Sequence, residues 1–387
     1  MNLTLFTSAV LLLLVWRYRP TGWQLSAALS IFALLFTSNW LGQLQWHRHQ
    51  ILQASPAQAQ LISTHLIVGY TDEDELLPLI QQGLIGGVFI TKRNITQQDG
   101  TAISQMIQRW QDLRQAQHLP PLVIATDQEG GLVSRLSPPL PFQPALGSLL
   151  QNSSNVRETA LEYARQQGRG LAQLGITLNL APVVDLDHGV ENPADRYSKI
   201  SRRALSSNPQ QVALAAQAYC KGLAESRVQC TLKHFPGLGR VFEDTHTDSA
   251  IIHTPLAELE KTDLLPFRTL QNSSALFMLS HAKVAALDER FPTSSSPAII
   301  QQLLRQQWQY QGLLITDDMG MAGAGDIESA AVRSLNAGAD YLLISWDPAR
   351  FYPVFHALLA AHEQNKLDLA QLSASRARIN QRQGALH

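Results

Sequence analysis

The sequence contains very little cysteine and has almost no net charge. Cys220 and Cys230 are the only cysteines in 387 residues, which is too few for a disulfide framework or a zinc site. We expect both to be buried thiols, one in a helix and one in the following strand. Lys and Arg number 30 against 31 Asp and Glu, and nucleic-acid surfaces usually need a basic excess, so nucleic-acid binding is not expected.

Charged side chains are also missing from most of the N-terminus. No Asp, Glu, Lys or Arg occurs in residues 1–16 or 20–47. The first apolar segment is short for a membrane span, which needs about 20 residues, whereas the second, Trp23–Leu44, is long enough. We therefore expect residues 1–46 to form a membrane anchor of one or two transmembrane helices.

The charges between the two apolar segments predict an orientation. Arg17 and Arg19 lie in the short connection, and by the positive-inside rule this connection is cytoplasmic. A two-span hairpin then places the large domain on the outer, periplasmic face of a bacterial inner membrane, while the cytoplasmic face stays an open alternative. A cleaved signal peptide is the rival interpretation, but its basic residues should precede the apolar run.

Short apolar runs alternate with amphipathic stretches through the rest of the chain. Eight runs are predicted strands: His65–Tyr70, Gly87–Thr91, Leu122–Thr126, Thr177–Val184, Cys230–His234, Ala275–His281, Leu313–Thr316 and Tyr341–Ser345. Helical patterns between most of them indicate an α/β fold, a (β/α)8 TIM-type barrel. A doubly wound open sheet is the alternative, weakened because no Gly-rich phosphate loop follows the first strand.

This pattern also divides the chain. We expect a linker or short helix in residues 47–63, a single catalytic barrel in residues 64–350, and closing helices with a polar tail in residues 351–387.

Ionisable side chains occur where five consecutive predicted strands end. They are Asp127 and Glu129, Asp185, Lys233 and His234, His281, and Asp317 and Asp318. Each alone could be a helix cap, a loop salt bridge or a core histidine. Together they indicate an active site, because the carboxyl ends of barrel strands face one mouth.

Carboxylates beside basic hydroxyl-binding groups suit a carbohydrate site. The chain has no Gly-x-Ser-x-Gly elbow and no His/carboxylate spacing typical of zinc, so we expect no metal or organic cofactor. Asp317 follows an apolar strand and is the candidate nucleophile of a retaining glycosidase, while Asp318 should turn away and pair locally. His246 has a suitable starting pKa for an acid/base, and Asp244 could orient it.

Three motifs carry a specific resemblance. They are Lys-His-Phe-Pro-Gly at residues 233–237, Asp-Thr-His at residues 244–246 and Ile-Thr-Asp-Asp-Met at residues 315–319. In this order they resemble glycoside hydrolase family 3, in its single-domain β-N-acetylhexosaminidase branch, over about residues 64–350. The resemblance implies a retaining mechanism with Asp317 as nucleophile and Asp244–His246 as the acid/base dyad.

The resemblance also implies the residues that bind the sugar. By position these are Asp127, Arg135, Arg203, Lys233 and His234. Two departures, Leu238 where the family often has His and Leu132 where Arg is common, leave the preference beyond the first sugar open.

The expected activity is that of a membrane-anchored β-N-acetylhexosaminidase that removes terminal β-linked N-acetylglucosamine from glycans, with peptidoglycan fragments as the expected source. Three alternatives remain at this stage: a phosphorylase using the same site, another β-glycosidase, and an inactive membrane-tethered glycan-binding protein.

Overall fold

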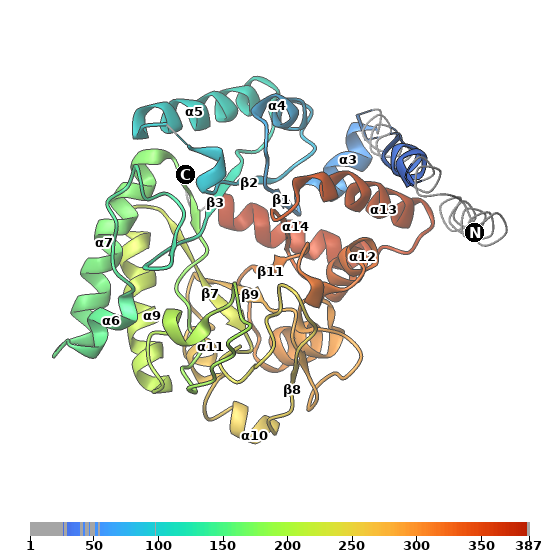
Figure 1. Cartoon of the computed structure of the whole chain (residues 1–387). Helices are drawn as coiled ribbons and strands as arrows, with labels where there is room; N and C mark the ends of the chain where they lie inside the picture. The colour runs from blue at the N-terminus through green and yellow to red at the C-terminus, as the bar shows by residue number, and fades with distance from the viewer. Residues whose placement is uncertain are drawn as a thin grey trace. The chain divides into compact units, whose positions relative to one another are not determined.

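The computed structural model describes most of the chain: Ser26, residues 29–38, Gly42, Trp46, and residues 51–52, 55–96 and 98–384. These residues belong to two compact units, the second of which begins at Ser55. Figure 1 shows the second unit, in which helices surround a central sheet.

The central sheet is a closed barrel of eight parallel strands in the part of the chain that the structure describes. Around the barrel the order is β1, β12, β11, β9, β7, β6, β3 and β2. Their bounds are β1 Leu66–Val68, β2 Gly87–Phe89, β3 Val123–Thr126, β6 Leu178–Asn179, β7 Gln229–Phe235, β9 Leu276–Leu279, β11 Leu314–Asp318 and β12 Tyr341–Ile344. All eight predicted strands are therefore confirmed. The open-sheet alternative is wrong, because β1 pairs with both β2 and β12.

The fourth predicted strand, Thr177–Val184, is much shorter than expected. Only β6, Leu178–Asn179, forms a regular ladder, and an isolated bridge joins Val183 to Lys233 further along. Pro182 lies between the two and cannot donate a backbone hydrogen bond, which interrupts the ladder.

Helices with recognisable caps cover the barrel. Asn155, Asn208 and Asp326 cap three of them by accepting a backbone N–H of the first turn. The longer helices are α3 Pro56–Ser63, α4 Glu73–Gln81, α5 Gly100–Ala116, α7 Val156–Leu174, α9 Pro209–Ala224, the π-helical η3 Ala298–Gln307, α12 Ile327–Ala337, α13 Phe351–Glu363 and α14 Leu369–Gly384. The shorter ones are η1 Lys92–Asn94, α6 Leu146–Gln151, α8 Ile200–Arg203, α10 Leu256–Leu259, α11 Leu265–Thr269, η2 Thr293–Ser295, η4 Ala322–Ala324 and η5 Pro348–Arg350.

Two small sheets lie outside the barrel. The antiparallel pair β4, Gln128–Gly130, and β5, Val133–Ser134, follows β3 directly, and the parallel pair β8, Ile251–Ile252, and β10, Lys283–Val284, joins two later loops. The first pair turns the chain back after β3. As a result, the backbone N–H of Arg135 donates to the carbonyl of Asp127 at 3.2 Å.

The two cysteines form a disulfide, so the prediction of two buried thiols is wrong. Cys220 of α9 bonds Cys230 of β7 across a Cα–Cα distance of 5.3 Å, and both are buried. The sequence pattern placed them correctly on a helix and the next strand but did not reveal that they face each other. The disulfide links α9 directly to β7, whose far end carries Lys233 and His234.

The N-terminal anchor is tested only in part. Residues 29–38 are helical, but among the described residues no helix is both long and apolar enough to cross a membrane. The first apolar segment lies outside the described residues, as does much of the second.

Removing the disulfide should weaken the barrel without abolishing it. We expect the Cys220→Ala/Cys230→Ala double variant to lose about 2–3 kcal/mol of unfolding free energy, because a cross-link closing a loop of this size restricts the unfolded chain by that amount. Urea unfolding of the full chain with and without reductant measures the effect. Reductant should destabilise the wild type and leave the double variant unchanged; an equal response of both proteins would contradict the bond.

Candidate active site

A cavity of about 510 Å³ opens at the carboxyl ends of the barrel strands. Seven of the eight predicted site residues line it: Asp127, Arg135, Arg203, Lys233, His234, His246 and Asp317. The eighth, Asp244, lies behind His246 and contacts its ring. The structure thus gathers into one site residues that are up to 190 positions apart, from Asp127 to Asp317.

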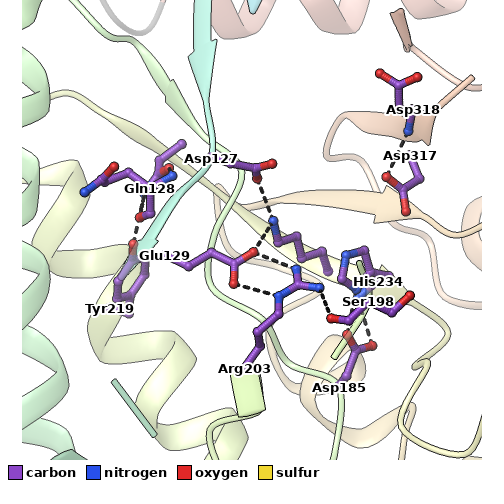
Figure 2. Close-up of polar contacts among 12 residues, drawn as sticks. Asp127, Gln128, Glu129, Asp185, Ser198, Arg203, Tyr219, His234, Asp317 and Asp318 are labelled. Carbon is purple, nitrogen blue, oxygen red and sulfur yellow. Dashed lines mark hydrogen bonds and ion pairs between the residues drawn. The ribbon is translucent and has the colours of Figure 1, made fainter. Parts of the chain in front are cut away.

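A buried cluster of two cations and two carboxylates forms one wall of the cavity. Nζ of Lys233 lies 2.7 Å from Oδ1 of Asp127 and 2.6 Å from Oε1 of Glu129. Arg203 donates to both oxygens of Glu129, at 3.0 and 2.7 Å, and Nη1 donates to the carbonyl of Ser198. Figure 2 shows the guanidinium of Arg203 meeting the Glu129 carboxylate. We call Asp127, Glu129, Arg203 and Lys233 the Glu129 cluster.

The charges in this cluster stabilise each other. Burial opposes ionisation of Glu129, but Arg203 and Lys233 outweigh it and lower its pKa from the ordinary 4.5 to about 2. Burial alone would lower the pKa of Lys233, because it also opposes a buried positive charge. The negative charges of Asp127 and Glu129 outweigh this effect, so the pKa of Lys233 is raised. Lys233 is therefore a fixed cation with firm partners, well suited to hold a sugar hydroxyl and poorly suited to act as a base.

His234 is oriented by Asp185. Its Nδ1 lies 2.6 Å from Oδ2 of Asp185, while Oδ1 accepts the backbone N–H groups of His234 and Leu238 at 3.0 and 2.8 Å (Figure 2). Because the carboxylate can only accept, Nδ1 carries a proton and Nε2 is left for the cavity. Leu238 is itself buried and does not line the cavity, so this departure from the family pattern lies outside the cavity wall.

Asp244 and His246 form a tightly held dyad. Oδ1 of Asp244 lies 2.8 Å from Nδ1 of His246 and also accepts its backbone N–H and the hydroxyl of Ser198. Oδ2 accepts the backbone N–H groups of Arg196 and Tyr197 at 3.2 and 3.1 Å. The segment before α8, residues 196–198, thus holds the loop that carries the dyad through hydrogen bonds to Asp244.

These contacts determine how Asp244 titrates. Burial disfavours its charged form, but the hydrogen bonds from His246 and Ser198 and the attraction of His246 lower its pKa to about 2. A permanently ionised Asp244 holds the proton on Nδ1 of His246 and stabilises the imidazolium. Nε2, directed away from Asp244, is then the atom that can transfer a proton.

Two adjacent carboxylates at the end of β11 have different environments. Oδ2 of Asp318 accepts the backbone N–H groups of Ser345 and Trp346 and the Ser345 hydroxyl, and Oδ1 accepts Gly320 N–H. The expected local pairing of Asp318 is therefore confirmed. The Asp317 side chain accepts only the Asp318 N–H among the contacts described, and it faces the cavity (Figure 2).

The charge state of Asp317 suits a nucleophile. Burial raises its pKa, but the neighbouring His234, His281 and His246 outweigh this and leave it below the ordinary value. Asp317 is thus an ionised carboxylate with few partners. His281 itself does not line the cavity; it is a core histidine bonded to Ser294 and to the carbonyl of Asp318.

Sequence reasoning missed several residues of the site. Glu129, Ser198, Tyr197 and Trp346 were not assigned roles, although Glu129 stood in the strand-end pattern beside Asp127. The signal available for Glu129 was its place two residues after Asp127, which was predicted to contact the sugar. Tyr197, Ser198 and Trp346 lie in loops, where the pattern gives no indication of what they contact.

Other features of the described residues do not compete with this site. A cavity of about 610 Å³ lies among α5, α7 and residues 139–143, but none of the predicted site residues lines it. Within the described ranges, no three His, Cys, Asp or Glu side chains are grouped as a metal site.

Removing Glu129 should destabilise the barrel strongly. We expect Glu129→Ala to cost about 3–5 kcal/mol of unfolding free energy, because it leaves two buried cations without their shared partner. Urea unfolding measures this, with Glu225→Ala as the control. Glu225 makes a two-point contact with Arg165 on the surface, so its loss should hardly move the midpoint.

The contribution of Glu129 to folding stability should decrease as the pH falls. Its pKa is lowered on folding, so its stabilisation is present above about pH 4.5 and is lost as the pH falls towards 2. The gap in stability between the wild type and Glu129→Gln should narrow over that range. A gap that widens on acidification would contradict the assigned ion pairs.

Comparison with known proteins agrees with this geometry. Residues 51–381 match the family described as the glycosyl hydrolase family 3 N terminal domain. A beta-hexosaminidase of Hydrogenovibrio crunogenus is 31% identical over 309 residues, which cover 75% of this chain and 83% of that protein. One of Xylella fastidiosa strain 9a5c is 33% identical over 286 residues, 72% of this chain and 81% of that one.

Solved structures show the same likeness. A family 3 beta-N-acetylglucosaminidase from Paenibacillus sp. str. FPU-7 superposes with a TM-score of 0.77 at 28% identity, covering 84% of this chain and 62% of that one. A beta-N-acetylhexosaminidase from Beutenbergia cavernae gives 0.75 at 28%, covering 84% and 98%. The resemblance seen in the three motifs is therefore confirmed, and the chain belongs to glycosyl hydrolase family 3.

Proposed function

We propose that this chain is a retaining β-N-acetylhexosaminidase that hydrolyses terminal β-linked N-acetylglucosamine, with peptidoglycan fragments as its natural source. The observation that carries the proposal is the convergence of Asp317 and the Asp244–His246 dyad on one cavity beside the Glu129 cluster. The relatives named beta-hexosaminidase support the class of sugar, and the similar beta-N-acetylglucosaminidase from Paenibacillus supports N-acetylglucosamine.

In the first step, the carboxylate of Asp317 attacks the anomeric carbon. His246, as imidazolium, gives its Nε2 proton to the leaving oxygen, and the bond to the leaving group breaks as the glycosyl–Asp317 ester forms. In the second step, neutral His246 takes a proton from water. The water oxygen then bonds the anomeric carbon and releases Asp317 with retained configuration.

The remaining predicted residues hold the sugar. Asp127 accepts hydrogen bonds from hydroxyls, whereas Arg135 and Lys233 donate to them, and His234 offers Nε2. Arg203 is bound on both Glu129 oxygens and on the Ser198 carbonyl, so its main effect is to fix the wall against which the sugar rests.

Substitution of Asp317 and of His246 should lower kcat with a different dependence on the leaving group of the substrate. Asp317→Asn should lower kcat by on the order of ten-thousandfold or more for every substrate, since it removes the nucleophile. His246→Ala should cost about 10²–10⁴-fold with a disaccharide but much less with an aryl glycoside, whose leaving group needs little protonation. Steady-state kinetics on both substrates measures this, with exposed His253→Ala as control.

The products of the same assay separate the rival chemistries. Free N-acetylglucosamine with and without added phosphate agrees with hydrolysis, whereas the sugar 1-phosphate would show phosphorolysis. Wild-type turnover of Asp317→Asn would contradict the nucleophile. A faster reaction with the aryl glucoside than with the N-acetylglucosaminide would contradict the sugar.

We further propose that residues 1–46 anchor the protein to a membrane with its barrel on the outer, periplasmic face. Two observations support this. The helical residues 29–38 expose Leu34 and Leu35 by 66% and 59%, which a lipid surface would cover. The Cys220–Cys230 disulfide is typical of oxidising compartments and rare in the cytosol.

Fractionation of cells tests this localisation. The full chain should sediment with membranes, and a chain lacking residues 1–46 should not. External protease should degrade the barrel once the outer membrane is opened, and its cysteines should resist alkylation until they are reduced. A full chain in the soluble fraction, or freely alkylated cysteines in the cell, would contradict the proposal.

A further inference from the structure

Two aromatic side chains stand beside the proton-transfer residue without an assigned role. The ring centres of Tyr197 and Trp346 lie 5.3 and 5.5 Å from that of His246 and 5.1 Å from each other. The two aromatic rings are nearly perpendicular, at 88°. Both line the cavity, and as residues they are 45% and 49% exposed, so neither is buried by the rest of the chain.

The backbone beneath Trp346 is held firmly. Its N–H donates to Oδ2 of Asp318 at 2.8 Å, and its carbonyl accepts Nη1 of Arg93 at 3.2 Å. Ser345, the residue before it, is bound to the same Asp318 oxygen and also to Arg93. The carboxylate next to the nucleophile therefore anchors the segment that presents this ring.

The backbone of Tyr197 is also held by hydrogen bonds. Its backbone N–H donates to Oδ1 of Asp195 and to Oδ2 of Asp244, each at 3.1 Å. Hence one carboxylate, Asp244, fixes both the acid/base ring and the tyrosine beside it.

The proposed direction of proton transfer indicates which part of the substrate lies beside the rings of Tyr197 and Trp346. His246 delivers its proton to the oxygen that leaves, so the leaving group must lie against His246 on the cavity side. Tyr197 and Trp346 are aromatic side chains that line the cavity and whose rings lie beside that of His246. A pyranose ring has C–H groups that pack on an aromatic face, whereas a small alcohol offers too little surface.

We propose that Tyr197 and Trp346 form a subsite for the leaving group that selects a sugar ring, so that the preferred substrates are glycans in which N-acetylglucosamine is linked to a further sugar. This inference rests on the proposed hydrolase reaction. It makes the two aromatic residues determinants of specificity, separate from the residues that hold the first sugar.

Two substrates with the same first sugar test the subsite. A disaccharide of N-acetylglucosamine has a ring as leaving group, whereas N-acetylglucosaminyl fluoride releases fluoride and has none. We expect Trp346→Ala to lower kcat/KM about tenfold for the disaccharide and less than about twofold for the fluoride, as the loss of one aromatic contact predicts. Trp346→Phe should recover part of the loss, and Tyr197→Ala should repeat the pattern.

Phe242 provides the matched control. It lies on the loop of the dyad and is 55% exposed, but it does not line the cavity, so Phe242→Ala should leave both substrates unaffected. The pH dependence of the disaccharide reaction should keep its shape in Trp346→Ala, because the subsite binds the leaving group and does not tune His246.

Each other result overturns a different statement. If the variants lost kcat/KM equally on both substrates, or if the pH profile were displaced, the rings would only position His246. If wild type and variants were equally active on the disaccharide, the rings would not contact the leaving group. A wild type inactive towards both substrates would overturn the proposed function and the subsite with it.

Discussion

The sharing of Glu129 by Arg203 and Lys233 is the interaction on which the rest of the site depends. It joins the hairpin after β3, the short helix α8 and the end of β7 within a buried space. Burial of any of these charges alone would cost several kcal/mol, and only the complete set is stable. The positions of Asp127 and Lys233 in the cavity wall follow from it, so the geometry of the proposed sugar site and the stability of the barrel share one source.

The carboxylates around the cavity differ chiefly in what already binds them. Glu129 is bound by two cations, Asp185 by a histidine and two backbone amides, and Asp318 by a serine and three backbone amides. Asp317 accepts one backbone N–H in the contacts described, and its oxygens face the cavity. A nucleophile must keep lone pairs free for the reacting carbon, and Asp317 meets that condition better than Glu129, Asp185 or Asp318.

The sequence predicted those features that depend on neighbours along the chain. The short apolar strands, their polar ends and the closed barrel follow from local pattern and from the rule that the carboxyl ends of barrel strands share a mouth. The disulfide, the Glu129 cluster and the Asp318–Trp346 contact depend on partners that meet only after folding. Cys220 and Cys230 show the difference: their elements were predicted, but the bond between them depends on side-chain directions that the nine intervening residues do not reveal.

The loop before α8 links three functions that appear separate in the sequence. Ser198 supports Asp244 through its hydroxyl and Arg203 through its carbonyl, and Tyr197 contributes both a backbone bond to Asp244 and a ring beside His246. A displacement of this loop would therefore disturb the proposed acid/base, the wall of the proposed sugar site and the proposed leaving-group surface together. These hydrogen bonds favour the ionised form of Asp244, so the charge that would stabilise an imidazolium also keeps the loop in place. The proposed proton transfer and the proposed leaving-group selection thus depend on one carboxylate.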